Sequence, residues 1–145
     1  MSTTTPQFTS LREKIAFETA QRKARYAAFA ADWTAAEEAG RKAACEANPT
    51  PMVIEGRNAD GVHTRYVVDE GPCGYAYITI HPATSSFARW IVKSGIGRKA
   101  YRGGVEVSVF EYNQSMTRKA AHAKAVAEYL TAKGYAGIDW FERID

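Results

Sequence analysis

The sequence is short of the features that mark membrane proteins, disulfide-rich proteins and metalloproteins. It has no apolar run near the roughly 18 residues that a membrane-spanning helix needs. Its first residues, Met1 to Phe8, lack the charged and then apolar pattern of a signal peptide. It has only two cysteines, Cys45 and Cys73, and three histidines without the spacing of metal ligands. We therefore expect a cytoplasmic protein with free thiols, no membrane contact, no metal and no cofactor.

Catalytic signatures are also missing. The string G-x-x-x-x-G-K-[ST], which forms the phosphate-binding loop of many NTPases, does not occur. No two histidines stand at metalloprotease spacing around a glutamate, and no serine stands in a recognisable nucleophile context. Because no nucleophile, carboxylate pair or metal cluster sits at a working spacing, we expect a protein that is not an enzyme.

The length and composition are those of one globular domain with an unevenly spread charge. The 145 residues are 46% hydrophobic and 24% charged, which is ordinary for a chain that buries a core. The net charge is +3, but residues 81–133 alone hold nine Lys and Arg against three Asp and Glu. A local excess of this kind indicates a partner of opposite charge rather than a particular fold.

A long helical arm is predicted for residues 9–48, after a disordered lead of residues 1–8. Ser10 and Glu13 stand at the spacing of a capping box, and the segment is rich in good helix formers up to Pro49. Gly40 interrupts this pattern, which indicates a kink, a close crossing with another element or a break into two helices.

An aromatic stripe follows one side of this predicted helix. Tyr26, Phe29 and Trp33 recur at three- and four-residue spacing and continue into a heptad-like series of small residues. Two interpretations stay open. The stripe packs on the protein's own sheet, or it forms a surface for a partner or for a second copy of the chain.

The remainder, residues 52–145, reads as an α+β core. Alternating patterns predict strands over residues 52–55, 63–69, 75–80, 105–112 and 138–141. Capping residues and apolar spacing predict helices before Gly95 and from Ser115 to Lys133. We expect a mixed or antiparallel sheet of about five strands with two helices on one face, plus the long N-terminal helix.

Residues 93–104, K-S-G-I-G-R-K-A-Y-R-G-G, form a basic, glycine-rich connection between a helix and a strand. Its glycines match a G-x-G-x-x-A string, but a dinucleotide fingerprint follows a strand and opens a helix, so that motif is rejected. Glycines still let backbone N–H groups approach an anion. The candidates for binding nucleic acid are the cationic and aromatic side chains of this loop: Lys93, Arg98, Lys99, Tyr101 and Arg102. The alternative is a solvated loop without a ligand.

A second candidate anion site lies where the last helix begins. A strand end leads there into a helix N-terminus, which exposes free N–H groups and the positive end of the helix dipole. Arg118 and Lys119 occupy the first turn, where the dipole disfavours cations unless an anion is bound. The alternative is that Asn113 or Ser115 simply caps the helix.

Three stretches carry a resemblance to known proteins: G-Y-A-Y-I-T-I-H-P-A-T-S-S-F-A-R-W, G-I-G-R-K-A-Y-R-G-G-V-E-V and E-Y-N-Q-S-M. Together with the following Ala-rich helix, residues 73–145 resemble a group of small proteins encoded by tailed bacteriophages. The resemblance implies a viral origin and a role in the infected cell, with no fold and no activity attached.

Two functional hypotheses follow. The first is a phage-type accessory protein that binds nucleic acid or a nucleotide-like anion through the basic loop, with affinity that falls as salt rises. The alternative is a protein-binding inhibitor of a host defence complex or polymerase, of the anti-CRISPR or anti-defence type. Because the chain is basic, mimicry of DNA is disfavoured for such an inhibitor.

Overall fold

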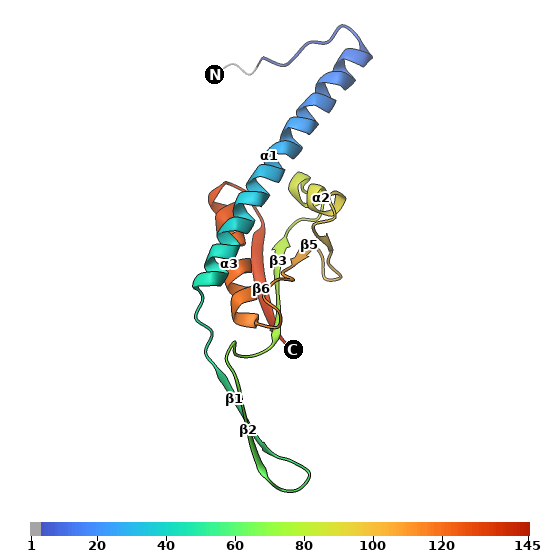
Figure 1. The fold of residues 1–145 in the computed structure, drawn as a ribbon. Coiled ribbons are helices and arrows are strands. Elements are labelled where there is room, and N and C mark those ends of the chain that lie inside the picture. The colour runs from blue at the N-terminus through green and yellow to red at the C-terminus, as the bar shows by residue number, and fades with distance from the viewer. Residues whose placement is uncertain (1–3) are drawn as a thin grey trace.

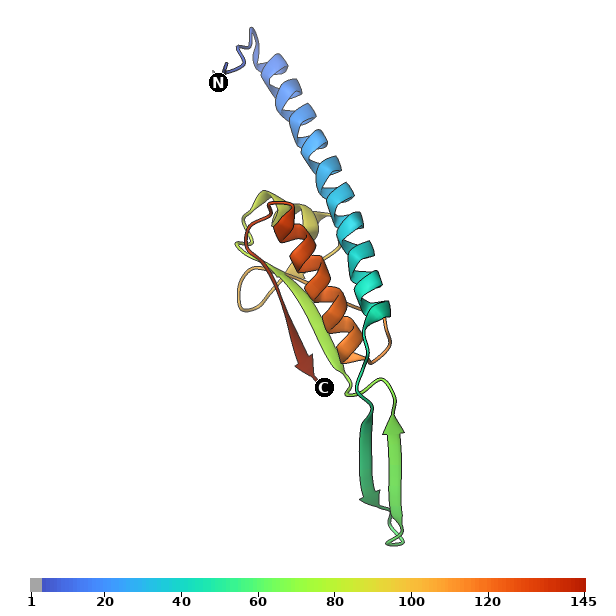
Figure 2. The same ribbon diagram turned by 90° about the vertical axis from the view of Figure 1, so that its left-hand side faces the viewer.

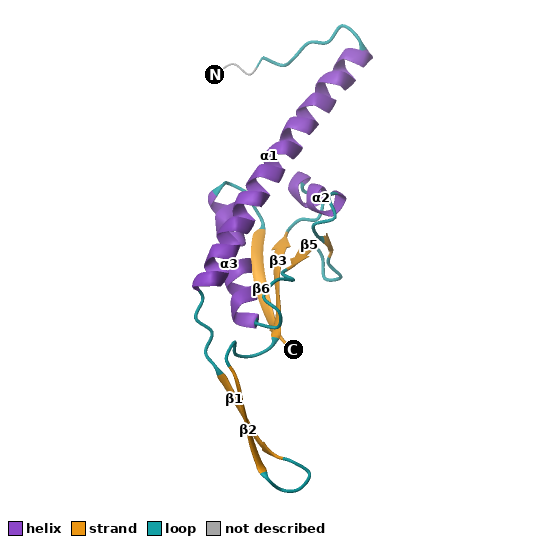
Figure 3. Cartoon of the chain, viewed as in Figure 1, coloured by secondary structure: helices purple, strands orange, loops and turns teal. Residues whose placement is uncertain are grey.

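The structure, a computed structural model, describes residues 4–145 and contains helices and strands in the order α-β-β-β-α-β-β-α-β (Figure 3). The predicted disordered lead lies partly outside the described residues, and residues 4–8 form no helix or strand. The elements are α1 (Leu11–Glu46), β1 (Met52–Arg57), β2 (His63–Val68), β3 (Gly74–Ile80), α2 (Ser86–Lys93), β4 (Arg98–Lys99), β5 (Val105–Ser108), α3 (Met116–Ala132) and β6 (Ile138–Ile144).

The core is a four-stranded sheet in the order β4-β5-β3-β6, in which every neighbouring pair is antiparallel (Figure 1). From β3 onward the chain runs β-α-β-β-α-β, so element order and strand order together match the split βαβ, or ferredoxin-like, arrangement. The prediction of one sheet of about five strands was wrong. Strands β1 and β2 form a separate hairpin, and the two-residue strand β4 completes the main sheet instead.

Side-chain alternation along β3 decides which face of the sheet is buried. Ala76, Ile78 and Ile80 are almost fully buried, as the period-two pattern predicts, whereas the residues between them are only half-buried. The core continues into the inward residues of β5 and into one face of α2 and one face of α3. Ser85 and Ser115 cap these two helices by accepting hydrogen bonds from the backbone N–H groups of Ala88 and Arg118.

Two helices were expected on one face of the sheet. The structure has a third layer on this side, because α1 packs on the outside of α3. Figure 2 shows α3 lying between the sheet and α1. The aromatic stripe of α1 is part of the protein's own core: Trp33 is buried, and the Phe29 ring lies 5.3 Å from the Phe87 ring of α2. Trp33 is therefore an internal contact, whereas Tyr26 and Phe29 are only partly buried, and a partner surface that includes them stays a prediction.

Gly40 marks a close crossing and neither a kink nor a break, because α1 is one continuous helix of 36 residues. A Cβ atom at this position would lie 2.9 Å from ring atoms of His122 in α3. The His122 ring is buried and its Nδ1 lies 2.8 Å from the Tyr112 hydroxyl. Glycine at position 40 thus allows α1 and α3 to approach each other.

Two segments project from the core in opposite directions (Figure 1). Residues 11–25 of α1 are all exposed, and buried positions begin only beyond them. The β1–β2 hairpin is also exposed along most of its length, including Val53, Ile54, Tyr66 and Val67. The predicted core of residues 52–145 is therefore divided in the structure: the hairpin stands apart, and the C-terminal half of α1 belongs with the core.

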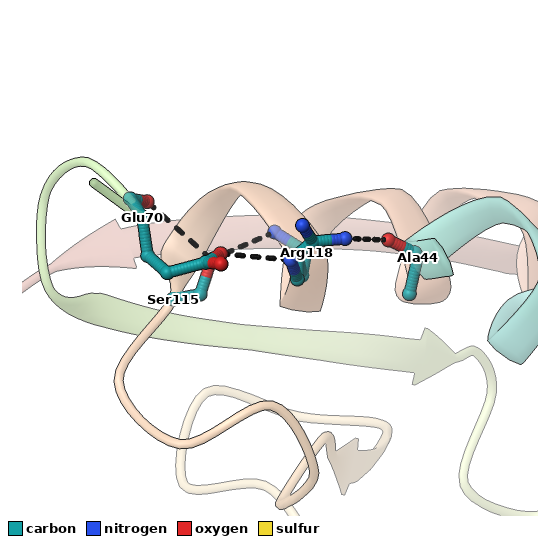
Figure 4. A network of polar contacts seen from close by, with 4 residues as sticks. All are labelled: Ala44, Glu70, Ser115 and Arg118. Atoms are coloured by element: carbon teal, nitrogen blue, oxygen red, sulfur yellow. Dashed lines mark hydrogen bonds and ion pairs between the residues drawn. The ribbon is translucent and has the colours of Figure 1, made fainter. Parts of the chain in front are cut away.

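A polar network anchors both projections where they leave the core (Figure 4). The Arg118 guanidinium donates to the Glu70 carboxylate at 2.7 Å and to the Ala44 carbonyl oxygen at 2.6 Å. The end of α1, the return from the hairpin and the first turn of α3 therefore meet at one side chain. The ion pair also lowers the pKa of Glu70, mainly through the hydrogen bond from Arg118.

Candidate nucleic-acid interface

The face of the sheet opposite the helices is covered by no other element of the described chain (Figure 2). Directly paired residues of antiparallel strands point to the same side, so the register identifies which side chains share this open face. They are Tyr75, Tyr77 and Thr79 of β3, Glu106 and Ser108 of β5, Arg98 of β4, and Asp139, Phe141 and Arg143 of β6.

Aromatic rings occupy the centre of the open face. Tyr77 and Phe141 are directly paired, with ring centroids 4.9 Å apart and an interplanar angle of 23°. Tyr75 lies one pair further along, and the guanidinium carbon of its partner Arg143 is 5.3 Å from its ring centroid. Phe141 keeps 42% of its surface exposed, which is unusual for a ring that could have been buried. The open face therefore offers flat apolar surfaces to a ligand.

The basic loop borders this face. Residues of the loop and of β6 enclose a hollow of about 650 Å³ whose floor includes Tyr77 and Phe141. Arg98, Arg102 and Arg143 line it. Arg98 is paired with Glu106, with two guanidinium nitrogens 2.9 and 3.0 Å from one carboxylate oxygen. Within residues 4–145, Arg102 and Arg143 form no ion pair.

The structure separates the predicted loop residues into two groups. Arg98, Tyr101 and Arg102 line the hollow on the open face, and the Tyr101 side chain is fully exposed. Lys99 pairs with Val105, whose side chain enters the core, so Lys99 points to the other side of the sheet. Lys93 lies at the end of α2, with its ammonium 5.4 Å from the Tyr26 ring on the helix side.

The two cations predicted at the start of α3 also have different positions. Arg118 is occupied by the internal network at the base of the hairpin, so we do not include it in the interface. Lys119 is 6% exposed, and its Nζ atom lies 5.6 Å from the Tyr75 ring centroid. It lines a second hollow of about 440 Å³, which shares Tyr77 and Arg98 with the first.

The remaining buried polar groups form pairs within the fold. Burial raises the pKa of the Tyr112 hydroxyl to about 12 and lowers the pKa of its partner His122. The Tyr135 hydroxyl donates to Asp32 at 2.7 Å, and burial again raises the tyrosine pKa. Residues 4–145 bring together no group of three His, Cys, Asp or Glu that could hold a metal ion. Within the same range, no helix is both long and apolar enough to span a membrane.

Reasoning from the sequence missed the aromatic part of this interface. The alternation that places Tyr75, Tyr77 and Thr79 on one side of β3 was visible, but nothing showed that this side lacks a cover. Phe141 and Arg143 alternate in the same way along β6. The available signal was an aromatic series on one face of two predicted strands, adjacent to a basic loop.

Comparison of the chain with protein-family models, with curated proteins and with solved structures finds no match.

Proposed function

We propose that this protein binds single-stranded nucleic acid on the open face of its four-stranded sheet. The observation that carries the proposal is the group of uncovered rings, Tyr75, Tyr77 and Phe141, bordered by arginines of the basic loop and of β6. The rings provide surfaces for unpaired bases, and the arginines provide charge for the phosphates. The basic loop is then one border of a larger interface.

The open aromatic face favours single strands over duplexes. In a duplex the flat faces of the bases are stacked on each other, so rings on a protein surface cannot reach them. An unpaired strand exposes these faces, and stacking on an aromatic side chain contributes about 1–3 kcal/mol per base. Antiparallel sheets with aromatic residues on an open face hold two or three bases in one widespread class of RNA-binding modules. Shared architecture alone does not establish shared function, so the argument depends on the side chains.

The charges of the face also suit a polyanion. Arg102 and Arg143 have no carboxylate partner within residues 4–145, and Arg98 keeps three-quarters of its side chain exposed beside Glu106. Within residues 4–145, Asp139 is the acidic residue of the face that forms no ion pair, and it accepts a hydrogen bond from the Trp140 backbone N–H. The balance is positive next to the rings, which favours binding that weakens as salt rises.

Fluorescence anisotropy with a labelled strand of about ten nucleotides tests the proposal. We expect saturable binding of single-stranded DNA or RNA, weaker binding of the matching duplex, and a loss of about tenfold or more in affinity for Tyr77→Ala and for Phe141→Ala. Tyr66→Ala is the matched control, because Tyr66 is an exposed tyrosine on the distant hairpin. Absence of binding to any single strand, or equal affinities of the Tyr77 and Tyr66 variants, would refute the proposal.

A further inference from the structure

Lys119 is the one feature near the open face that the proposed function does not yet use. A lysine is rarely buried unless a carboxylate pairs with it, because removing an ammonium group from water is costly. Lys119 is 6% exposed, yet within residues 4–145 it makes no ion pair and no side-chain hydrogen bond. The side chain is therefore buried while its ammonium group has no partner in the described chain, which leaves this group available to an anion from outside.

The ammonium group of Lys119 opens into a hollow and not into the sealed core. No fully enclosed side-chain nitrogen or oxygen in the described chain lacks a hydrogen-bond partner. Since the Lys119 Nζ has no such partner, it must keep contact with solvent. Its opening is the hollow of about 440 Å³ between β3 and the end of β5, where Tyr75, Ser108 and Phe110 also lie.

A second cation approaches the same tyrosine. The Tyr75 ring has the Lys119 Nζ at 5.6 Å and the Arg143 guanidinium carbon at 5.3 Å from its centroid. The π-face of the ring offsets part of the cost of holding these charges, but it does not neutralise them. Positive charge is thus concentrated around Tyr75, near the end of the open face where β3 begins, and the start of the basic loop lines the same hollow as Lys119.

We infer that Lys119, together with Arg143, forms a phosphate-binding subsite at the Tyr75 end of the open face. This inference rests on the proposed function, because the phosphate is that of a strand whose bases lie on Tyr77 and Phe141. Tyr77 borders both hollows, so a base stacked on it places the neighbouring phosphates on its two sides. Arg102 contacts the nucleic-acid strand from the first hollow, Lys119 contacts it from the second, and Arg98 borders both hollows.

The test is the salt dependence of binding in the full-length Lys119→Met variant. Methionine keeps the long apolar side chain that fills the space beside Tyr75 but removes the charge. We expect affinity for a ten-nucleotide strand to fall about tenfold at low salt. The slope of log affinity against log salt should decrease by about 0.7, the value for one phosphate contact on a single strand. Lys124→Met is the matched control, because Lys124 is an exposed lysine on the same helix.

Additional variants and a second pair of oligonucleotides complete the test of the Lys119 subsite. If the Lys119→Met variant does not fold, Lys119→Gln, which also removes the charge, takes its place, and Arg143→Met should reduce the slope by a similar amount. Oligonucleotides with a 5′-phosphate and with a 5′-hydroxyl show which phosphate Lys119 binds. If the Lys119 variant loses the same affinity for both, Lys119 binds a backbone phosphate. If it loses affinity only for the 5′-phosphorylated one, Lys119 binds the terminal phosphate. An unchanged slope in the folded Lys119 variant, with binding still lost in Tyr77→Ala, would overturn the subsite alone. Failure of the wild-type protein to bind would overturn the proposed function as well.

Discussion

At the crossing of α1 and α3, we predict that Gly40→Ala lowers the stability of the protein, although helix propensity alone would make this substitution stabilising. In an isolated helix, Gly40→Ala would be stabilising by about 1 kcal/mol. In the folded protein the new methyl group would lie 2.9 Å from three ring atoms of His122. The ring cannot easily move, because it is buried and its Nδ1 lies 2.8 Å from the Tyr112 hydroxyl. Overpacking of this kind costs about 1–3 kcal/mol, and losing the hydrogen bond adds about 1 kcal/mol.

The expected net effect of Gly40→Ala is a destabilisation of about 1–3 kcal/mol, or a decrease of about 3–9 °C in Tm for a chain of this size. Urea and thermal unfolding followed by circular dichroism measure it. The double variant Gly40→Ala/His122→Ala provides the critical comparison. The double variant should be as stable as the His122→Ala single variant or more stable, because the imidazole ring that the methyl group added at position 40 would meet is absent from both. Stabilisation by Gly40→Ala in the wild-type background would refute the close crossing.

Three further predictions concern stability and the hairpin. Burial lowers the pKa of His122 below its ordinary value of 6.5, so the unfolded chain takes up the proton first as the pH falls. The urea midpoint should therefore be higher at pH 7.5 than at pH 5.5, and His122→Gln should reduce this difference. Arg118→Met should cost about 1–2 kcal/mol in unfolding free energy, because the Ala44 carbonyl loses a charged donor, and Glu70→Gln should cost less. Replacing residues 52–68 by a short Gly-Ser linker should leave the core fold and nucleic-acid binding intact, since within residues 4–145 the two strands of the hairpin pack mainly on each other. Loss of cooperative unfolding in that variant would contradict this.

The elements with strong local signals could be predicted from the sequence. Ser10 caps α1, as its capping-box spacing indicates, and Ser115 caps α3, as one of the two residues proposed for that role. The alternation along β3 correctly separates buried from outward residues, because one face of this strand packs on the core. These features depend on neighbouring residues only, so a single sequence contains them.

Features that depend on distant contacts could not be predicted. Strand β4 has two residues, too few for any periodic pattern, and it exists because Arg98 and Lys99 pair with β5. The hairpin has the composition of a strand pair within a larger sheet, and only the structure shows that β1 and β2 form a sheet of their own. In the sequence, Arg118 is a cation at a helix start with no evident partner. In the structure it donates a hydrogen bond to the carboxylate of Glu70, which is distant in sequence.

The candidate site also combines features that the sequence predicts locally with features that depend on distant contacts. The basic loop was visible as a run of charged residues, and three of its side chains line the hollow on the open face. The rings of Tyr77 and Phe141 lie far apart in the sequence, and the β3–β6 register brings them together. Whether an outward face is covered is a property of the whole fold, so the open aromatic surface needed a structure to be recognised.

The most direct test of the open-face interface is an amide chemical-shift titration of the ¹⁵N-labelled protein with a short single strand. We predict that the largest shifts occur along β3, β5 and β6 and in the basic loop around Arg102, with the exposed part of α1 and the hairpin unaffected. Shifts confined to α1 or the hairpin, or no shifts at saturating strand concentration, would contradict binding on the open face.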